Sequence, residues 1–217
     1  MATMTQKDAW QLAGQTVAAH RDELRALTTH AELFEWAKAN SLATQNLFPK
    51  FKSELRKQVH VDYDALRAQA MTERAASLSA AASDAPLIRL CTAGDIEVNS
   101  FAVCDGEGGD PWYGLFHEKD RVTDQDEADL SAARKAIYLA GQARQYGELD
   151  VVRLELTVSN HMVDADSLRD AAVRGKVVVE VTVVDGDDDN PALEMCRVPG
   201  FRTWREVSLT DLIAQEG

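Results

Sequence analysis

The sequence predicts an α+β protein in which an all-helical bundle, residues 1–84, precedes a mixed sheet with flanking helices, residues 85–217. Up to residue 84, apolar residues recur at helical spacing and no segment alternates with a period of two. From Ile88 onward, short segments alternate apolar and polar residues, as strands covered on one face do. The charge divides at the same place. Residues 1–84 carry 10 basic and 10 acidic side chains and residues 85–217 carry 13 and 26, so the net charge of -13 lies entirely in the second part.

The composition is that of a soluble globular chain with one large or two small domains. Its 217 residues are 45% hydrophobic and 27% charged, enough for a sizeable core. No apolar run approaches the roughly 18 residues that cross a bilayer, and the first residues lack a secretory pattern. We therefore expect no membrane partner and a cytoplasmic location. Cys91, Cys104 and Cys196 have no CxxC spacing, which predicts buried free thiols and neither a disulfide framework nor a zinc site.

Three or four helices are predicted in the first part. The first follows Thr5, a residue that suits an N-cap, and carries Trp10, Val17, Leu24 and Leu27 at helical spacing. The others are expected around residues 31–39, from about residue 49 to residue 58, and from residue 62 onward. Alanine and serine dominate residues 75–86, which predicts a frayed helix end that continues as a linker.

The second part is predicted to run β-β-β-α-β-α-β. The expected strands cover residues 88–92, 99–105, 111–118, 152–158 and 177–183. A long helix should begin among the acidic residues 124–129, which suit a helix N-terminus, and end at Gly147. A short helix is expected over residues 167–174, and an irregular tail with a short helix from Thr210 should follow the last strand.

That order and four local motifs resemble the type 1 ribonuclease H family over about residues 87–200. The family's first strand ends in T-D-G, and residues 92–94 read T-A-G. Its first helix carries E-L before small residues, and residues 129–133 read D-L-S-A-A. Its fourth strand ends in D-S, where residues 159–160 read S-N. Its fifth strand leads to G-H-x-G-x-x-x-N-E-x-(C/A)-D, in the place of residues 186–197. The resemblance implies a ribonuclease H-like mixed five-stranded sheet.

The resemblance argues for the fold and against the family's activity. Enzymes of this family hydrolyse the RNA strand of an RNA–DNA hybrid with two metal ions, which four carboxylates hold. The four matching positions are Ala93, Asp129, Ser159 and Arg197, and the family's loop histidine corresponds to Asp187. Only Asp129 keeps a carboxylate, and a guanidinium at Arg197 would repel cations. We therefore expect a scaffold that has lost nuclease activity, needs no cofactor, and binds a protein partner or a second copy.

An alternative reading keeps a divergent metal-dependent nuclease, which acts on RNA–DNA hybrid or another nucleic acid with Mg²⁺ or Mn²⁺. In this reading Asp129 joins relocated acids, of which Asp95, Asp187, Asp188 and Asp189 are the candidates. Further acids follow the second and fourth strands, at Asp105, Asp164 and Asp166. The competing interpretation is that these acids only solvate turns and helix N-termini.

The helical part offers a second route to nucleic acid. Residues 31–39, a break at residues 40–42 and a helix to Gln58 have the outline of a helix-turn-helix. Its second segment carries side chains of the types that contact bases and phosphates: Thr44, Gln45, Asn46, Lys50, Lys52, Arg56 and Lys57. Against this, Pro49 interrupts that segment, the glycine typical of the turn is absent, and the part has no net charge. A bundle used for packing or dimerisation is the competing interpretation, with Phe34, Trp36, Phe48 and Phe51 as core.

Overall fold

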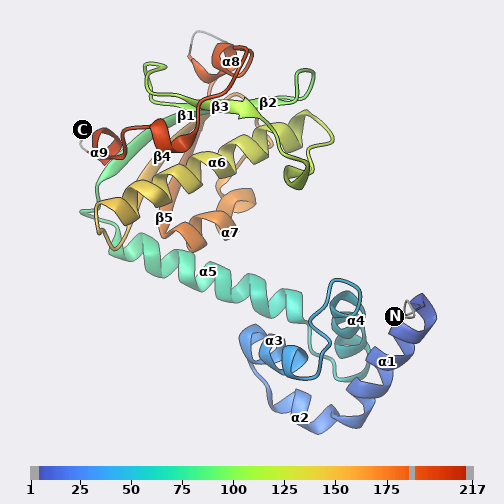
Figure 1. The fold of residues 1–217 in the computed structure, drawn as a ribbon. Coiled ribbons are helices and arrows are strands. Elements are labelled where there is room, and N and C mark those ends of the chain that lie inside the picture. Colours follow the sequence, from blue (N-terminus) through green and yellow to red (C-terminus); the bar gives the residue numbers. More distant parts are fainter. Residues whose placement is uncertain (1–4, 186–188, 214–217) are drawn as a thin grey trace. The chain divides into compact units, whose positions relative to one another are not determined.

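The computed structural model describes residues 5–185 and 189–213, and the chain divides into two compact units, Met1–Glu73 and Arg74–Gly217. As predicted, a helical region precedes a mixed five-stranded sheet with helices (Figure 1). Helix α5 (Tyr63–Ala81) crosses the border between the units. The alanine- and serine-rich run is therefore helical as far as Ala81, where the sequence suggested a frayed end.

Four helices lie before α5 in the first unit: α1 (Gln6–Ala19), α2 (Arg21–Ala26), α3 (His30–Ala39) and α4 (Phe48–Gln58). Thr5 caps α1 through its side chain, as predicted. Thr29 and Glu32 form a reciprocal capping box at the start of α3. Pro49 lies in the first turn of α4, where its missing N–H breaks no helical hydrogen bond.

The single first helix expected from the sequence is two helices, α1 and α2, which meet at His20. The buried face of α1 carries Ala9, Ala13 and Val17, which recur every four residues. Trp10 stands one position from that face and is 43% exposed, so its expected place in the apolar stripe is wrong. A step of one residue turns a helix by about 100°, which carries the indole out of the core.

Aromatic rings fill the core of the helical unit. The rings of Trp36 and Phe51 are stacked with centroids 5.7 Å apart. Phe48 packs edge-on against Phe34 at 5.4 Å and against Tyr63 at 5.2 Å. These contacts are the offset and edge-to-face arrangements that aromatic pairs prefer. The rings are therefore engaged with one another, with Phe34 at the margin because it is 38% exposed.

The second unit is built on β1 (Leu87–Asp95), β2 (Ser100–Cys104), β3 (Trp112–Leu115), β4 (Val152–Val158) and β5 (Val177–Val183). The strand order is β3-β2-β1-β4-β5. The first three strands form an antiparallel meander, and β4 and β5 add in parallel to β1. This topology, with its flanking helices, is consistent with a ribonuclease H-like fold.

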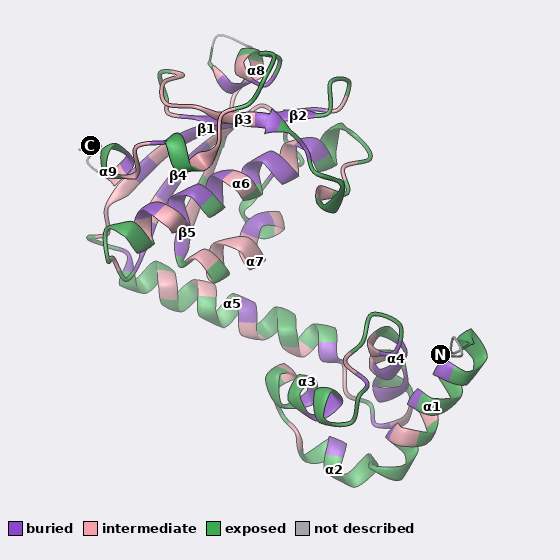
Figure 2. Ribbon diagram, viewed as in Figure 1, coloured by how far each residue is buried: buried purple, intermediate pink, exposed green. Residues whose placement is uncertain are grey.

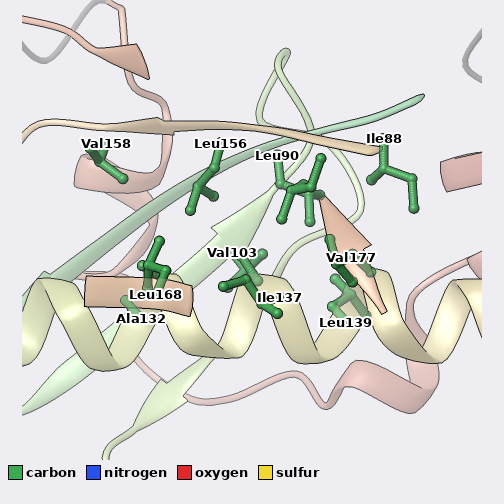
Figure 3. Packing of buried hydrophobic residues seen from close by; sticks show 14 of the residues in the cluster. Ile88, Leu90, Val103, Ala132, Ile137, Leu139, Leu156, Val158, Leu168 and Val177 are labelled. Atoms are coloured by element: carbon green, nitrogen blue, oxygen red, sulfur yellow. The ribbon is translucent and has the colours of Figure 1, made fainter. Parts of the chain in front are cut away.

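Helices α6 (Gln125–Tyr146) and α7 (Ala165–Gly175) cover one face of the sheet. Their apolar side chains interlock with those of the strands around Leu90, Val103, Ile137, Leu156 and Leu168 (Figure 3). The face of α6 toward the sheet is buried over most of the helix (Figure 2). Alanine dominates that face, which brings the helix close to the sheet.

The opposite face carries a smaller cluster beneath α8 (Ala192–Met195). Its buried members are Cys91, Ala93, Ala102, Cys104, Ala192 and Cys196. The three cysteines are buried free thiols, which confirms the prediction from their spacing. Two 3₁₀ turns, η1 (Glu118–Asp120) and η2 (Trp204–Glu206), and α9 (Leu209–Ile213) complete the unit. None of the helices drawn from residues 5–185 and 189–213 has the length and apolar character needed to cross a membrane.

Strand β5 forms one edge of the sheet, since its only neighbour in the strand order is β4. Six of its seven residues are valine or threonine, and the seventh, Glu180, stands at its centre with an exposed side chain. In the register, Glu180 lies opposite Glu155, which in turn pairs with Arg89 at 2.9 Å.

Candidate functional site

The carboxylate of Asp129 lies near the start of α6, where both of its oxygens accept hydrogen bonds from the protein. The backbone N–H of Gly94 donates to Oδ1 at 3.0 Å. The side-chain amides of Gln125 and Asn160 both donate to Oδ2, each at 2.9 Å. Three donors from β1, α6 and the end of β4 therefore converge on the one family position that keeps an acid. A metal ion bound to Oδ2 would have to displace both amide donors.

The first family position, Ala93, is buried in the apolar cluster beneath α8. Ala192 and Cys196 share that cluster, so a carboxylate here would be placed among apolar groups. The next residue, Gly94, faces α6 at very close range. A Cβ atom on Gly94 would lie 2.4 Å from the backbone carbon of Ala128. The glycine of the T-A-G motif is thus required for packing, independently of any chemistry.

The third family position, Ser159, accepts a hydrogen bond from Asn190, which is fully buried. The Asn190 amide donates to Ser159 Oγ at 3.0 Å and to the Thr92 carbonyl at 3.1 Å. Its own oxygen accepts the backbone N–H of Ala192 at 3.2 Å. One side chain thereby ties the ends of β1 and β4 to the start of α8, and it uses the serine as an acceptor.

The fourth family position, Arg197, forms an ion pair with Asp95, the last residue of β1. Its Nε lies 2.7 Å from Asp95 Oδ2, and the Asp95 side chain is only 7% exposed. Burial raises the pKa of Asp95, but the hydrogen bonds from Arg197 and from the backbone N–H groups of Val98 and Glu97 outweigh it and leave the pKa below its ordinary value. The strongest candidate for a relocated ligand is therefore already neutralised by a cation of the chain.

Of the remaining candidate acids, only Asp189 lies within the described residues. Asp189 is exposed in a turn, and Asp187 and Asp188 lie outside the described residues. Throughout residues 5–185 and 189–213, no three side chains of histidine, cysteine, aspartate or glutamate are arranged to hold a metal ion. The structure brings Ala93, Asp95, Asp129, Ser159 and Arg197 to one end of the sheet, but it does not assemble them as a set of oxygen ligands.

Three further acids have partners close to them in the sequence. Asp105 accepts the N–H groups of Glu107 and Gly109 in the turn between β2 and β3. Asp164 caps α7, and Asp166 in its first turn pairs with Arg169. All three therefore lie in a turn or at a helix N-terminus, as expected if they are not metal ligands.

The cysteine cluster supplies no thiolate ligand next to this end of the sheet. Burial raises the pKa of Cys104 to about 12 and the pKa of Cys196 to about 11. Burial also raises the pKa of Cys91. The thiolate is the form that binds metals and acts as a nucleophile, and at neutral pH these groups are almost entirely thiols.

An open hollow of about 440 Å³ lies over Asp129. Gln125, Ser159, Asn160, Met162 and Leu193 line it together with His161. Its walls therefore offer one carboxylate, two amides, a hydroxyl, an imidazole and two apolar side chains. Such a surface can donate and accept hydrogen bonds, but it lacks the concentrated negative charge that holds a pair of divalent cations.

Sequence reasoning missed Gln125, Asn160 and Asn190, the three amide side chains that organise this region. Gln125 is the first residue of α6, and Asn160 lies just after the end of β4. Both residues stand next to the matched motifs, so the sequence could have drawn attention to them. Asn190 was hidden in an acid-rich run, and its only signal is the Asn-Pro pair that precedes α8.

The basic residues proposed to contact nucleic acid have partners within the helical unit. Lys50 is buried and donates to the carbonyl and side-chain oxygens of Asn46 at 2.8 and 2.7 Å. The others reach carboxylates: Lys52 lies 2.7 Å from Asp64, Arg56 lies 2.6 Å from Asp62, and Lys57 lies 3.9 Å from Glu54. Their positive charge is thus balanced locally.

The connection between α3 and α4 covers residues 40–47, which is longer than the three- or four-residue turn of a helix-turn-helix. Thr44, Gln45 and Asn46 lie in this connection, before the start of α4. Thr44 Oγ1 accepts the N–H of Leu47, while Gln45 and Asn46 are exposed. The polar side chains and the basic side chains are therefore not presented by one helix.

No protein-family model matches the chain, and a search of curated proteins finds no match either.

Proposed function

We propose that this chain is a divergent relative of the type 1 ribonuclease H family that serves as a non-catalytic interaction scaffold. The observation that carries the proposal is the state of Asp129, the only retained acid, whose two oxygens accept three N–H donors of the protein. A carboxylate saturated in this way stabilises the end of the sheet.

The other three positions support the same conclusion. Ala93 is enclosed beneath α8, Ser159 accepts a hydrogen bond from a buried amide, and Arg197 neutralises Asp95. Two-metal hydrolysis needs several carboxylates that face a shared space and hold cations about 3.5–4 Å apart. A guanidinium beside that space opposes cation binding, because it stays protonated throughout the pH range in which the protein is folded.

The test is hydrolysis of a labelled RNA–DNA hybrid by the purified protein in 10 mM Mg²⁺ or Mn²⁺. An active ribonuclease H serves as the positive control, and Asp129→Asn is assayed beside the unmodified chain. We expect no cleavage by either form. Cleavage by the unmodified chain that disappears in Asp129→Asn would contradict the proposal and establish the divergent nuclease. Cleavage that survives in Asp129→Asn would indicate a contaminating enzyme.

A further inference from the structure

A groove between α6 and α7 differs in charge from the rest of its unit. It has a volume of about 300 Å³, and its described lining residues are Arg134, Ile137, Tyr138, Gly141, Gln142, Gln145, Ala171, Arg174 and Gly175. No carboxylate is among them, although residues 85–217 hold 26 acids. In the sequence, residues 130–147 contain no aspartate or glutamate.

The floor of the groove is made by a close approach of the two helices. A Cβ atom on Gly141 would lie 3.5 Å from Gly175 Cα, so the backbones pass each other with little between them. Arg144 fixes this crossing, because its Nε donates to the Gly175 carbonyl at 3.0 Å and its Nη1 to the Leu149 carbonyl at 2.8 Å. Tyr138, which is 45% exposed, and Ala171 add apolar surface beside the crossing.

The two rims carry exposed guanidinium groups. Arg134 stands on α6 and Arg174 on α7, and both are exposed. Arg174 donates its Nε to the Asp170 carbonyl at 3.0 Å, and no ion pair within the described residues joins either arginine to a carboxylate. This contrasts with Arg169, Arg197 and Arg202, which are paired with Asp166, Asp95 and Asp110.

We infer that this groove binds an acidic peptide segment of a protein partner. From Arg134 to Gln145 the groove follows α6 for about 16 Å at 1.5 Å per residue. An extended segment of about five residues, at 3.3 Å each, covers that length. Its carboxylates would pair with Arg134 and Arg174 in the bidentate manner that guanidinium groups favour. Its apolar side chains would cover Tyr138 and Ala171, and Gln142 and Gln145 would form hydrogen bonds with its backbone.

Charge complementarity selects this occupant over nucleic acid. A nucleic acid needs a broad basic face, because its phosphates repeat every few ångströms and each carries a charge. Outside the groove the unit is strongly acidic, and the repulsion acts over a Debye length of about 8–10 Å at physiological salt. A peptide of a few carboxylates, held between two arginines on an apolar floor, avoids most of that repulsion.

The groove would be the surface through which the proposed scaffold binds its partner, and only the assignment to a protein partner rests on that proposed function. Each of the two proposals can be contradicted without the other. Nuclease activity would end the scaffold proposal and leave peptide binding to be measured, whereas absent peptide binding would end the groove proposal alone.

The experiment uses the full chain and a fluorescein-labelled eight-residue peptide in which glutamates alternate with leucines. Fluorescence anisotropy is measured at 50 and 200 mM NaCl. We expect saturable binding that weakens with salt and falls at least about tenfold in the double variant Arg134→Glu/Arg174→Glu. The matched control, Arg121→Glu, makes the same charge change at an exposed arginine outside the groove and should alter binding less than about twofold.

Three results would overturn the inference. The first is no saturable binding of the acidic peptide, or equal binding of the version with lysine in place of glutamate. The second is equal weakening by Arg121→Glu. The third is displacement of the peptide by an eight-nucleotide single strand at lower concentration, which would assign the groove to nucleic acid. Sedimentation of both forms completes the test, because a dimer dissociated by the double variant without peptide binding would assign the groove to a second copy.

Discussion

Two regions along α6 hold their polar groups in opposite ways. At the sheet end, around Asp129, the three polar side chains at the matched positions are each bonded to another residue of the chain, and these are Asp129, Ser159 and Arg197. In the groove, which begins about one and a half turns later at Arg134, the guanidinium groups on the rims have no carboxylate partner among the described residues. The polar groups of the first region are engaged with the rest of the chain, whereas the two rim arginines of the second are exposed.

The difference teaches that the number of charges near a surface is a poor guide to binding. The sheet end holds two aspartates, Asp95 and Asp129, and the oxygens of both already accept hydrogen bonds from the chain. The groove carries two exposed arginines, Arg134 and Arg174, and no ion pair among the described residues engages either of them. If this contrast is correct, substitutions at the sheet end should lower stability and substitutions in the groove should leave it unchanged.

The largest expected effect is at Gly94. In Gly94→Ala the new methyl group would meet the backbone of α6 at 2.4 Å, so the helix must move away from β1. We expect a loss of about 3 kcal/mol in the free energy of unfolding, as for severe overpacking. The measurement is urea denaturation followed by circular dichroism. Gly106→Ala is the control, since nothing lies within 4 Å of that position, and a similar loss there would contradict the explanation.

Asn190→Ala should have the next largest effect. The substitution removes three hydrogen bonds and leaves the Thr92 carbonyl and the Ala192 N–H without their partner inside the protein. Unsatisfied buried groups cost about 1–3 kcal/mol, so we expect a loss of about 2–3 kcal/mol in urea denaturation. Asn160→Ala also deletes an asparagine amide, but from a half-buried position, so it should lower the free energy of unfolding less. An equal loss would show that the burial of Asn190 does not explain its effect.

Arg197→Ala should weaken the fold in a pH-dependent way. The lowered pKa of Asp95 means that its ionised form stabilises the folded state above the unfolded pKa of about 3.9, and this contribution disappears as the pH falls through the folded pKa. Without Arg197 the Asp95 pKa rises. The variant should therefore lose about 1.5 kcal/mol at pH 7, the contribution of a hydrogen bond to a charged group, and converge on the unmodified chain at low pH.

The readout is the thermal midpoint between pH 3 and pH 8. Arg89→Ala removes a comparable ion pair, with Glu155, in which both side chains are about 40% exposed, and solvent screening makes its expected effect small. A constant difference across the whole pH range for Arg197→Ala would show that Asp95 is not the partner through which it acts.

Asp129→Asn should lower the free energy of unfolding by about 1 kcal/mol, because one acceptor oxygen becomes a donor that faces the amides of Gln125 and Asn160. The same variant also tests whether Asp129 binds a metal ion. A ligand that binds only the folded state raises its stability. We expect that 10 mM Mg²⁺ leaves the thermal midpoint of both forms within about 1 °C, and a rise confined to the unmodified chain would show that Asp129 binds the cation.

Arg134→Ala and Arg174→Ala should have the smallest effect, below about 0.5 kcal/mol each in urea denaturation, as for ordinary surface positions. Arg144→Ala is the contrasting variant, since it removes two hydrogen bonds that join α6 to the end of α7 and to the following loop. A large loss at Arg134 or Arg174 would mean that these arginines stabilise the fold, and the contrast between the two regions would be lost.

The order of elements was predictable because strands covered on one face, such as residues 152–158, alternate clearly in sequence. The break at His20 was not, since no glycine or proline marks it. The length of α5 was also missed. Alanine is the strongest helix former, and a run such as residues 75–81 continues a helix although its composition resembles a linker.

At the sheet end, motif order pointed to Asp129 but said nothing about its partners. Gln125, Asn160 and Gly94 come from three separate elements, and only the fold brings them together. The groove was equally hidden, because Arg134 and Arg174 are 40 residues apart and unremarkable singly. The absence of acids over residues 130–147 was visible in the sequence, and it is the signal that could have pointed there.

The position of Glu180 has a consequence for the behaviour of this protein in concentrated solution. An edge strand rich in valine is a template on which the same strand of another molecule can assemble. Because Glu180 is the middle residue of β5, an antiparallel pairing that uses the whole strand sets two glutamates directly opposite each other. Like charges in that arrangement repel, so the Glu180 carboxylate disfavours assembly through this edge of the sheet.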